Sequence, residues 1–227
     1  MGLTKFEKLF ISLRYYLLAA AKFDPSYKYA LDALEFAKEI HVGTRKDGFT
    51  PEFQHQLEIA HFVRTLDIRF PAATIAVVLL HDVLEDYSDK APFVTKEQIY
   101  ARFGQQIGDA CVLISKEYQG VKVPTQEYYD RMAECPICSI AKGGDRVHNQ
   151  SSMANVFTKT KQVSYTAETV DYVLPMLKVA RRIHFDQESA YENIKFVLQS
   201  QITFVHAYNK NEERNEKALN DLARAIT

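Results

Sequence analysis

The stretch Pro71-Ala72-Ala73-Thr74-Ile75-Ala76-Val77-Val78-Leu79-Leu80-His81-Asp82-Val83-Leu84-Glu85-Asp86 decides the fold of this chain. As far as Leu80 its residues are apolar on most sides of a helix, a pattern typical of a helix that is buried all round. Pro71 suits the first turn of such a helix, where its missing N–H costs nothing. The stretch therefore predicts a central buried helix.

Four ionisable side chains interrupt the end of this apolar run. Residues four positions apart share a helix face, so His81 would lie above Glu85, and Asp82 above Asp86. One interpretation is a solvated strip on an amphipathic helix, with the histidine satisfied in the core. The other is a functional site, because the flanking residues are too apolar for a surface and burying unpaired carboxylates is costly.

Two residues elsewhere in the chain favour a metal site. His55 precedes the stretch, and Asp145 follows about sixty positions later in a polar segment. Together with His81 and Asp82 they make a mixed nitrogen and oxygen ligand set for a divalent cation. Such a set, with positions left open for water or a phosphate oxygen, is typical of metal-dependent hydrolysis.

The composition is that of an ordinary globular protein. The chain has 227 residues, 47% hydrophobic and 25% charged, which suits a single domain over residues 1–227 with a sizeable core. A net charge of −1 gives no general field for nucleic acid, so we expect no nucleic-acid partner, and a phosphate-rich ligand would need a local basic cluster. Three cysteines favour a reducing, cytoplasmic compartment over a disulfide framework. Self-association is left open.

Helical periodicity runs through nearly the whole chain, and the predicted fold class is all-α. Charged residues interrupt the segment from Leu3 to Phe23 too often for a membrane span, so an amphipathic helix and no membrane partner are expected. Further helices are predicted at 29–42, 57–66, 71–84, 95–102, 107–116, 126–141, 167–183 and 188–208, with a loop or short hairpin at 119–125 and a closing helix at the end. The pair Cys135 and Cys138 lacks the partners of a zinc or redox site, so buried, inert thiols are predicted.

Several motifs occur in a fixed order: His41 to Gly48, the His81-Asp82 and Glu85-Asp86 pairs, Thr95 to Gly104, Lys142 to Asn149, and Glu168 to Pro175. In this order they resemble the HD-superfamily alarmone hydrolases, that is, the hydrolase domain of RelA/SpoT proteins and the single-domain small alarmone hydrolases. The resemblance covers roughly residues 30 to 185, which would be the core of an HD-domain helical bundle. It implies removal of the 3′-pyrophosphate from guanosine tetra- and pentaphosphate, (p)ppGpp.

The resemblance also implies residue roles. The ligands of one Mn²⁺ ion per chain would be His55, His81, Asp82 and Asp145, with zinc as the other common metal. Glu85 and Asp86 would position or deprotonate the attacking water. The residues expected to contact the guanosine nucleotide are Arg45, Lys46, Lys142, Arg146, Asn149, Ser151 and Tyr172.

The chain departs from the family at a few positions. Gln56 replaces a proline after the ligand histidine, and the loop before it carries one insertion, so His61 is the alternative to His55. Gly143-Gly144 replaces Leu-Ala; two glycines weaken a helix by roughly 1 kcal/mol each, or they admit a close neighbour. Two other functions remain open: an HD phosphohydrolase acting on another nucleotide, such as an adenine alarmone, NADPH or a nucleoside monophosphate, and a non-catalytic nucleotide-binding protein.

Overall fold

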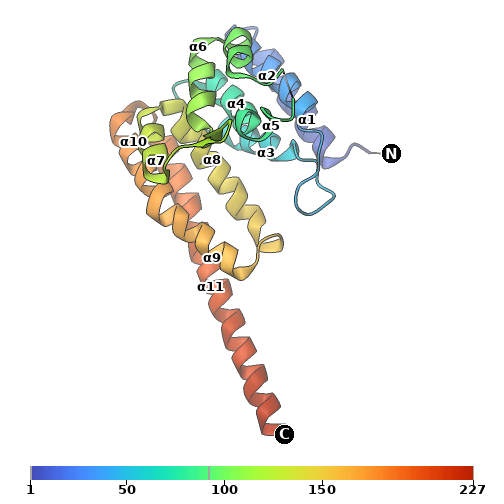
Figure 1. Cartoon of the computed structure of the whole chain (residues 1–227), viewed down its shortest axis with the longest axis vertical. Coiled ribbons are helices and arrows are strands. Elements are labelled where there is room, and N and C mark those ends of the chain that lie inside the picture. The colour runs from blue at the N-terminus through green and yellow to red at the C-terminus, as the bar shows by residue number, and fades with distance from the viewer. Residues whose placement is uncertain (1, 92, 227) are drawn as a thin grey trace.

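The computed structural model describes residues 2–91 and 93–226, except for the side chains of residues 155, 212–213 and 216–226. Over this part of the chain the all-α prediction is confirmed. The helices are α1 (Lys5–Ala20), α2 (Tyr27–Ile40), α3 (Gln54–Val63), α4 (Pro71–Leu80), α5 (Val83–Tyr87), α6 (Lys96–Ile114), α7 (Thr125–Glu134), α8 (Pro136–Ser152), α9 (Lys159–Glu168), α10 (Leu174–Ile183) and α11 (Glu188–Ile226). Figure 1 shows α1 to α8 gathered into one body, from which the later part of α11 extends.

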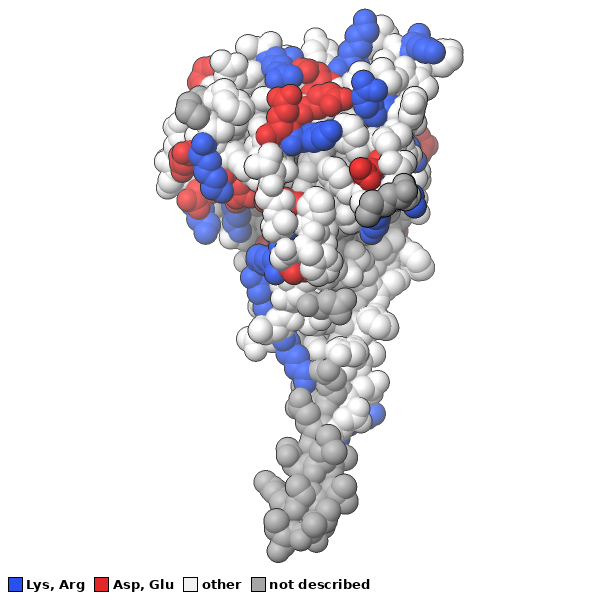
Figure 2. Space-filling model, turned by 90° about the vertical axis from the view of Figure 1, so that its right-hand side faces the viewer, with Lys and Arg blue, Asp and Glu red and all other residues white. Residues whose placement is uncertain are grey.

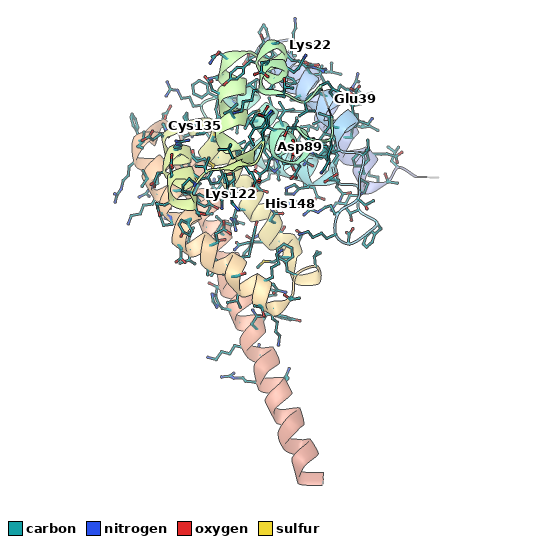
Figure 3. The ribbon with its side chains drawn as sticks, in the orientation of Figure 1. Lys22, Glu39, Asp89, Lys122, Cys135 and His148 are labelled. Atoms are coloured by element: carbon teal, nitrogen blue, oxygen red, sulfur yellow. The ribbon has the colours of Figure 1, made fainter. Side chains whose placement is uncertain are left out.

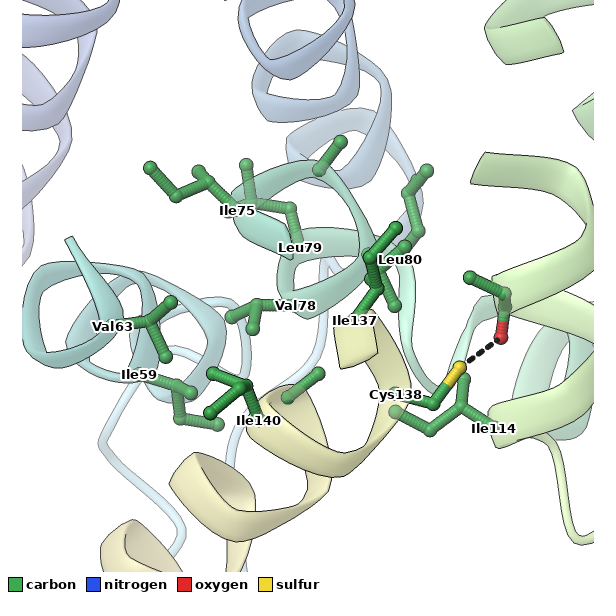
Figure 4. Packing of buried hydrophobic residues seen from close by; sticks show 14 of the residues in the cluster. Ile59, Val63, Ile75, Val78, Leu79, Leu80, Ile114, Ile137, Cys138 and Ile140 are labelled. Carbon is green, nitrogen blue, oxygen red and sulfur yellow. Dashed lines mark hydrogen bonds between the residues drawn. The ribbon is translucent and has the colours of Figure 1, made fainter. Parts of the chain in front are cut away.

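The predicted central helix is α4, whose residues from Ala72 to Leu80 are all buried. It packs against α2, α3, α6 and α8, so its apolar surface meets another helix on every side. Figure 4 shows Ile59 of α3 and Ile140 of α8 close to Val78 of α4. Burial of one aliphatic side chain contributes roughly 1.5–3 kcal/mol, so a helix buried along its length contributes strongly to the stability of the fold.

Local sequence signals set several element boundaries. Thr4 and Glu7 form a capping box at the start of α1, in which each side chain accepts the other's backbone N–H. Thr95, where the sequence predicted a helix to begin, caps α6 by accepting the N–H of Gln98 at 3.2 Å. Gly104 has φ +77°, which few side chains tolerate, so α6 bends at the glycine where we expected it to end.

The segment 119–125 includes the turn of a short hairpin. The strands β1 (Glu117–Tyr118) and β2 (Val121–Lys122) pair antiparallel. Gln119 and Gly120 both have positive φ, 50° and 76°, which is the conformation of a tight two-residue hairpin turn.

The central helix does not continue to residue 84 as predicted. Its regular part ends at Leu80, and α5 begins at Val83, with Asp82 at φ −108° and ψ 0° between them. The N–H of Asp86 still bonds to the carbonyl of Asp82 at 2.8 Å. At the interruption His81 Nδ1 bonds to the carbonyl oxygen of Val78, and His41 and Gln56 hold the Asp82 carboxylate.

The predicted helix 126–141 is likewise two helices. It breaks at Cys135, which caps α8, and Pro136 occupies the first turn of α8, where a proline is favoured. The helix then runs through Gly143 and Gly144 to Ser152. A Cβ atom at Gly143 would lie 2.9 Å from Ile194 Cγ2, and one at Gly144 would lie 3.1 Å from Ile59 Cγ2. The two glycines therefore let α8 pack closely between α3 and α11.

The cysteine prediction needs correction at one position. Cys111 and Cys138 are buried, but Cys135 is only half-buried. Its sulfur interacts with the side chain of Cys138 and accepts the backbone N–H of Cys138, and these contacts lower the pKa of Cys135 to about 6 although burial opposes the change. Figure 3 shows Cys135 well away from His148, which lies further along α8.

None of the helices among the described residues combines the length and the apolar character that crossing a bilayer requires.

Candidate metal centre

Three predicted ligands meet where α3, α4 and α8 converge. His55 comes from α3, His81 follows the end of α4, and Asp145 lies on α8. The Nε2 atoms of His55 and His81 lie 3.1 Å and 3.8 Å from Oδ1 of Asp145. One ligand atom from each residue lies within 4.8 Å of the other two.

The hydrogen-bond chemistry of this trio suits a cation. His81 Nδ1 lies 2.8 Å from the carbonyl oxygen of Val78, which can only accept, so Nδ1 carries the hydrogen. In a neutral imidazole, Nε2 then presents a lone pair to Asp145. Burial lowers the pKa of His55 to about 4, so this ring is neutral near pH 7. Nitrogen lone pairs and a carboxylate directed at one point are the donor set of a divalent metal.

The rival histidine points elsewhere. His61 Nε2 lies 2.9 Å from the carbonyl oxygen of Leu9, on the side of α3 that faces α1. His55 is thus the histidine of α3 that reaches His81 and Asp145.

Asp82 lies beside the trio and is held by two other residues. Its Oδ1 atom is 2.9 Å from His41 Nε2, and its Oδ2 atom accepts a hydrogen bond of 2.9 Å from Gln56 Nε2. Oδ2 is also 3.8 Å from His81 Nε2. Burial alone would raise the pKa of Asp82, but the neighbouring histidines outweigh it and hold the pKa well below its usual range. Asp82 is therefore an ionised carboxylate at the edge of the centre.

Asp145 is anchored from its own helix. Oδ2 pairs with Lys142 Nζ at 3.0 Å, and Oδ1 accepts a hydrogen bond of 2.6 Å from Asn149 Nδ2. Burial would raise the pKa of Asp145, but Lys142 and the two histidines keep it well below its usual range. The carboxylate is ionised and fixed in direction.

The two carboxylates expected to handle water differ in position. Asp86 lines the cavity described below, and burial together with the charges of Asp82 and Glu85 raises its pKa. Glu85 is outside the lining residues and accepts the backbone N–H of Lys116 at 2.9 Å. Asp86 is thus the better placed of the two to exchange a proton with a ligand in the cavity.

A cavity of about 600 Å³ opens beside the centre, within the size range of small-molecule sites. His55, Asp82 and Asp86 are part of its wall. Its other polar and charged lining residues include Lys5, Thr44, Arg45, Lys46, Asp47, Thr50, Glu52, Gln54, Gln56, Glu58, His148, Asn149 and Ser152. Figure 2 shows cationic and anionic side chains intermingled over one face of the body, so positive charge is local rather than general.

Three predicted nucleotide contacts line this cavity. Arg45 and Lys46 lie on the loop between α2 and α3, which the backbone bridge from Thr44 to Pro51 closes. Arg45 donates a hydrogen bond of 3.4 Å to Asn149 Oδ1, and the Lys46 ammonium lies 5.4 Å from the centre of the Phe157 ring. The loop therefore faces the end of α8 across the cavity.

The other four predicted contacts lie outside the lining residues. Lys142 is paired with Asp145, and Tyr172 stacks on Tyr129 at 5.5 Å. Ser151 donates to the carbonyl of His148, and its neighbour Ser152 lines the cavity instead.

Arg146 is a core residue. Only 2% of its surface is exposed, and its guanidinium donates to Tyr129 and Glu168, each at 3.0 Å. The same group lies 3.9 Å from the centre of the Tyr165 ring. Together these contacts join α8 to α7 and α9.

Sequence reasoning missed several residues around the centre. His41 and Gln56 bind Asp82, and Glu58 binds His148. Phe157 adds an aromatic wall and Lys5 a third cation at the cavity. One signal was available, because Gln56 stands where the family has proline, but the pairings themselves join residues far apart in sequence.

Comparisons with known proteins agree with this geometry. Residues 33–115, which include His55, His81 and Asp82, match the family model described as HD domain. A GTP pyrophosphokinase of Brucella ovis is 27% identical over 152 residues, covering 63% of this chain and 19% of the relative. A GTP pyrophosphokinase of Myxococcus xanthus is 23% identical over 219 residues, covering 87% of this chain and 27% of the relative. The chain thus spans about a fifth to a quarter of these relatives, and its resemblance to the HD superfamily is confirmed.

Proposed function

We propose that this HD-domain chain removes the 3′-pyrophosphate from (p)ppGpp, giving GDP or GTP and pyrophosphate, with one Mn²⁺ ion per chain. The observation that carries the proposal is the position of the His55, His81 and Asp145 trio beside a cavity that Arg45 and Lys46 line. Relatives named GTP pyrophosphokinases support a guanosine nucleotide as the ligand. Free cysteines suit activity in the cytoplasm.

His55, His81 and Asp145 would hold the metal, with Asp82 completing the set from its place beside His81. Mixed histidine and carboxylate ligation suits Mn²⁺. The bound ion would polarise a phosphoryl oxygen and lower the pKa of a bound water. Lys142 and Asn149 keep the Asp145 carboxylate aligned throughout.

Asp86 would take the proton of the attacking water. Its raised pKa brings a carboxylate closer to the range in which a general base works at neutral pH. Glu85, tied to the backbone of Lys116, would act mainly by adding negative charge beside Asp86.

The cavity rim would hold the nucleotide. A guanidinium plane stacks well on a base, which suits Arg45, and the ammonium of Lys46 would neutralise phosphate. Asn149 keeps Arg45 directed at the cavity and can also offer a donor or acceptor to the ribose.

A direct test is to incubate the purified protein with ppGpp and Mn²⁺ and to resolve the products by anion exchange. We expect GDP and free pyrophosphate, loss of turnover in chelator, and recovery on adding Mn²⁺. Asp145→Ala and Asp82→Ala should lose bound metal together with turnover. Asp86→Asn should keep metal while turnover falls by ~10²–10⁴-fold, as for a general base. Full turnover in chelator would refute the metal mechanism.

A second candidate is hydrolysis of another nucleotide at the same centre. The carboxylates of Asp47 and Glu52 also line the cavity, and negative charge there favours a substrate with fewer phosphates than ppGpp. NADPH and a nucleoside monophosphate should therefore be assayed in parallel, and an adenine alarmone tests the base alone, because it carries as many phosphates as ppGpp. Brisk cleavage of one of these beside no reaction with ppGpp would select this candidate.

A further inference from the structure

A continuous line of polar side chains stands behind His55, on the side away from Asp145. His55 Nδ1 lies 2.8 Å from His148 Nδ1, although the two residues are 93 positions apart in sequence. His148 Nε2 in turn contacts Glu58 Oε2 directly. Glu58 Oε1 pairs with the Lys5 ammonium at 2.5 Å. The line joins α1, α3 and α8.

The chemistry of each atom fixes the direction of these hydrogen bonds once His55 binds a cation. Glu58 is ionised, because His148 and Lys5 outweigh the effect of burial and hold its pKa at about 2. A carboxylate can only accept, so His148 Nε2 must carry a hydrogen. A cation on His55 Nε2 requires a lone pair there, which leaves the hydrogen of the neutral ring on Nδ1. The Nδ1–H group of His55 then donates a hydrogen bond to Nδ1 of His148, which carries no hydrogen.

We propose that Glu58 and His148 are positioning residues that hold His55 as its Nδ1–H tautomer, with Nε2 directed at a divalent cation. The inference rests on the metal centre of the proposed function and adds the groups that prepare one of its ligands. Partners behind a metal-binding histidine fix its tautomer and ring orientation and raise its basicity, and losing them typically weakens metal binding by 10–100-fold.

The surrounding packing holds His55, His148 and Glu58 in this arrangement. The exposed fractions of the His55 and His148 side chains are 7% and 13%, so water competes little for their hydrogen bonds. The two rings lie 4.6 Å apart between centres, at 67° to each other, which aligns one Nδ1 with the other. Glu58 follows His55 by three positions on α3, so both side chains leave the same helix face towards α8.

The first test reads the tautomers in the wild-type protein and needs no substitution that could disturb folding. Protein labelled with ¹⁵N-histidine is loaded with Zn²⁺, a diamagnetic cation, and long-range ¹H–¹⁵N correlations locate the ring hydrogens. We expect His55 with its hydrogen on Nδ1 and His148 with its hydrogen on Nε2. A Zn²⁺-loaded protein in which His55 carries its hydrogen on Nε2 would overturn the proposal.

The second test measures metal affinity by titration calorimetry with Zn²⁺ and with Mn²⁺. Glu58→Leu and His148→Gln should each bind 10–100-fold more weakly, and Glu58→Gln, which keeps an acceptor oxygen, should recover part of the loss. Because the two residues act in one line, the double variant should lose little more than the worse single variant. Glu192→Leu on α11 is the matched control, since Glu192 also binds two side chains, Arg181 and Lys195, but lies outside the cavity lining.

The outcomes separate this inference from the proposed function. Unchanged affinity in Glu58→Leu, with the Glu192→Leu control also unchanged, would overturn the positioning role and leave the metal centre standing. Zn²⁺ binding with the expected tautomers but no cleavage of ppGpp would overturn the substrate and leave the positioning role standing. A wild-type protein that takes up neither cation would overturn both.

Discussion

The ammonium of Lys142 lies 3.0 Å from Oδ2 of Asp145, one turn further along the same helix. The other oxygen of that carboxylate faces the two histidines, so Lys142 neutralises this candidate ligand from the opposite side. The exposed fractions of the two side chains are 19% and 7%. The pair is thus an internal ion pair, in which a lone charge would be poorly solvated.

Lys142→Met should therefore destabilise the protein more than it impairs nucleotide binding. Removing one partner of a buried pair costs roughly 3–5 kcal/mol because the other charge is left uncompensated. Urea unfolding in chelator should show this loss, and Lys142→Met combined with Asp145→Asn should lose less than the two single variants added together. A variant of normal stability with a raised KM would instead identify Lys142 as a phosphate contact.

Two arginines that the sequence predicted as nucleotide contacts, Arg45 and Arg146, should respond differently to substitution. Arg45→Ala should raise KM for ppGpp at nearly unchanged stability, because Arg45 lines the cavity and makes one long hydrogen bond. Arg146→Ala should lower the free energy of unfolding by roughly 3 kcal/mol or more, because it leaves the buried environment of Glu168 and Tyr129 without a cation. Steady-state kinetics and urea unfolding of both variants test this difference. A destabilised Arg45→Ala variant beside a stable Arg146→Ala variant with a raised KM would contradict it.

The metal-free protein should lose stability as the pH falls from about 6.5 to about 4. His55 has a pKa of about 4 in the folded chain, whereas the ordinary pKa of histidine is 6.5. Between these two pH values the unfolded chain therefore binds a proton at His55 that the folded chain does not bind. The difference corresponds to about 3 kcal/mol at ~1.4 kcal/mol per pKa unit. The raised pKa of His41 acts in the opposite sense, because its contribution is present at low pH and lost as the pH rises.

This contribution can be isolated by substitution. His55→Gln removes the titrating ring, so the free energy of unfolding, measured in chelator at several pH values, should depend less on pH between 6.5 and 4. Asp145 and Asp82 have lowered pKa values, so their contribution is lost only below about pH 4 in both proteins. Identical pH profiles for the variant and the wild type would contradict the assignment.

Gln56→Leu should weaken metal binding with little loss of stability. The substitution removes one of the two hydrogen bonds that orient Asp82, an effect typically worth 10–100-fold in metal affinity. It also removes the Oε1 atom of Gln56, which is fully buried and has no hydrogen-bond partner among the described residues, and that offsets the lost bond. Gln150→Leu is the control, since Gln150 is buried with an equally unpartnered oxygen but binds Thr169. Equal effects of the two substitutions would contradict the role of Gln56.

Much of the helical architecture could be predicted because its signals are local. The apolar run before His81, the cap at Thr95 and the turn at Gln119 and Gly120 depend on neighbours within a few positions. Pro136 is a local signal for the start of α8, but helical periodicity across it led to the prediction of one continuous helix from 126 to 141. The break after Leu80 could not be predicted this way, because the partners that hold Asp82 beside it, His41 and Gln56, lie 41 and 26 positions away.

The candidate site was predictable only in part, for the same reason. The motif order predicted His55, His81 and Asp145, and the structure brings these three together. Other groups around the centre, such as Gln56 and Glu58, are polar residues on helix faces whose sequence pattern suggests exposure to solvent. Their partners are Asp82 and His148, 26 and 90 positions away, and such pairings follow from packing rather than from periodicity.

The glycine pair in α8 has a consequence for hydrogen exchange. Glycine gives α8 little intrinsic preference for the helix at Gly143 and Gly144, so its order there depends on Ile194 of α11 and Ile59 of α3. Backbone amides around Asp145 should therefore lose protection together with those of the contacting turns, as one cooperative unit, rather than fray from the end of α8. Local opening of α11 near Ile194 would then also release Asp145, a candidate metal ligand, although no contact between Ile194 and Asp145 is needed for this coupling.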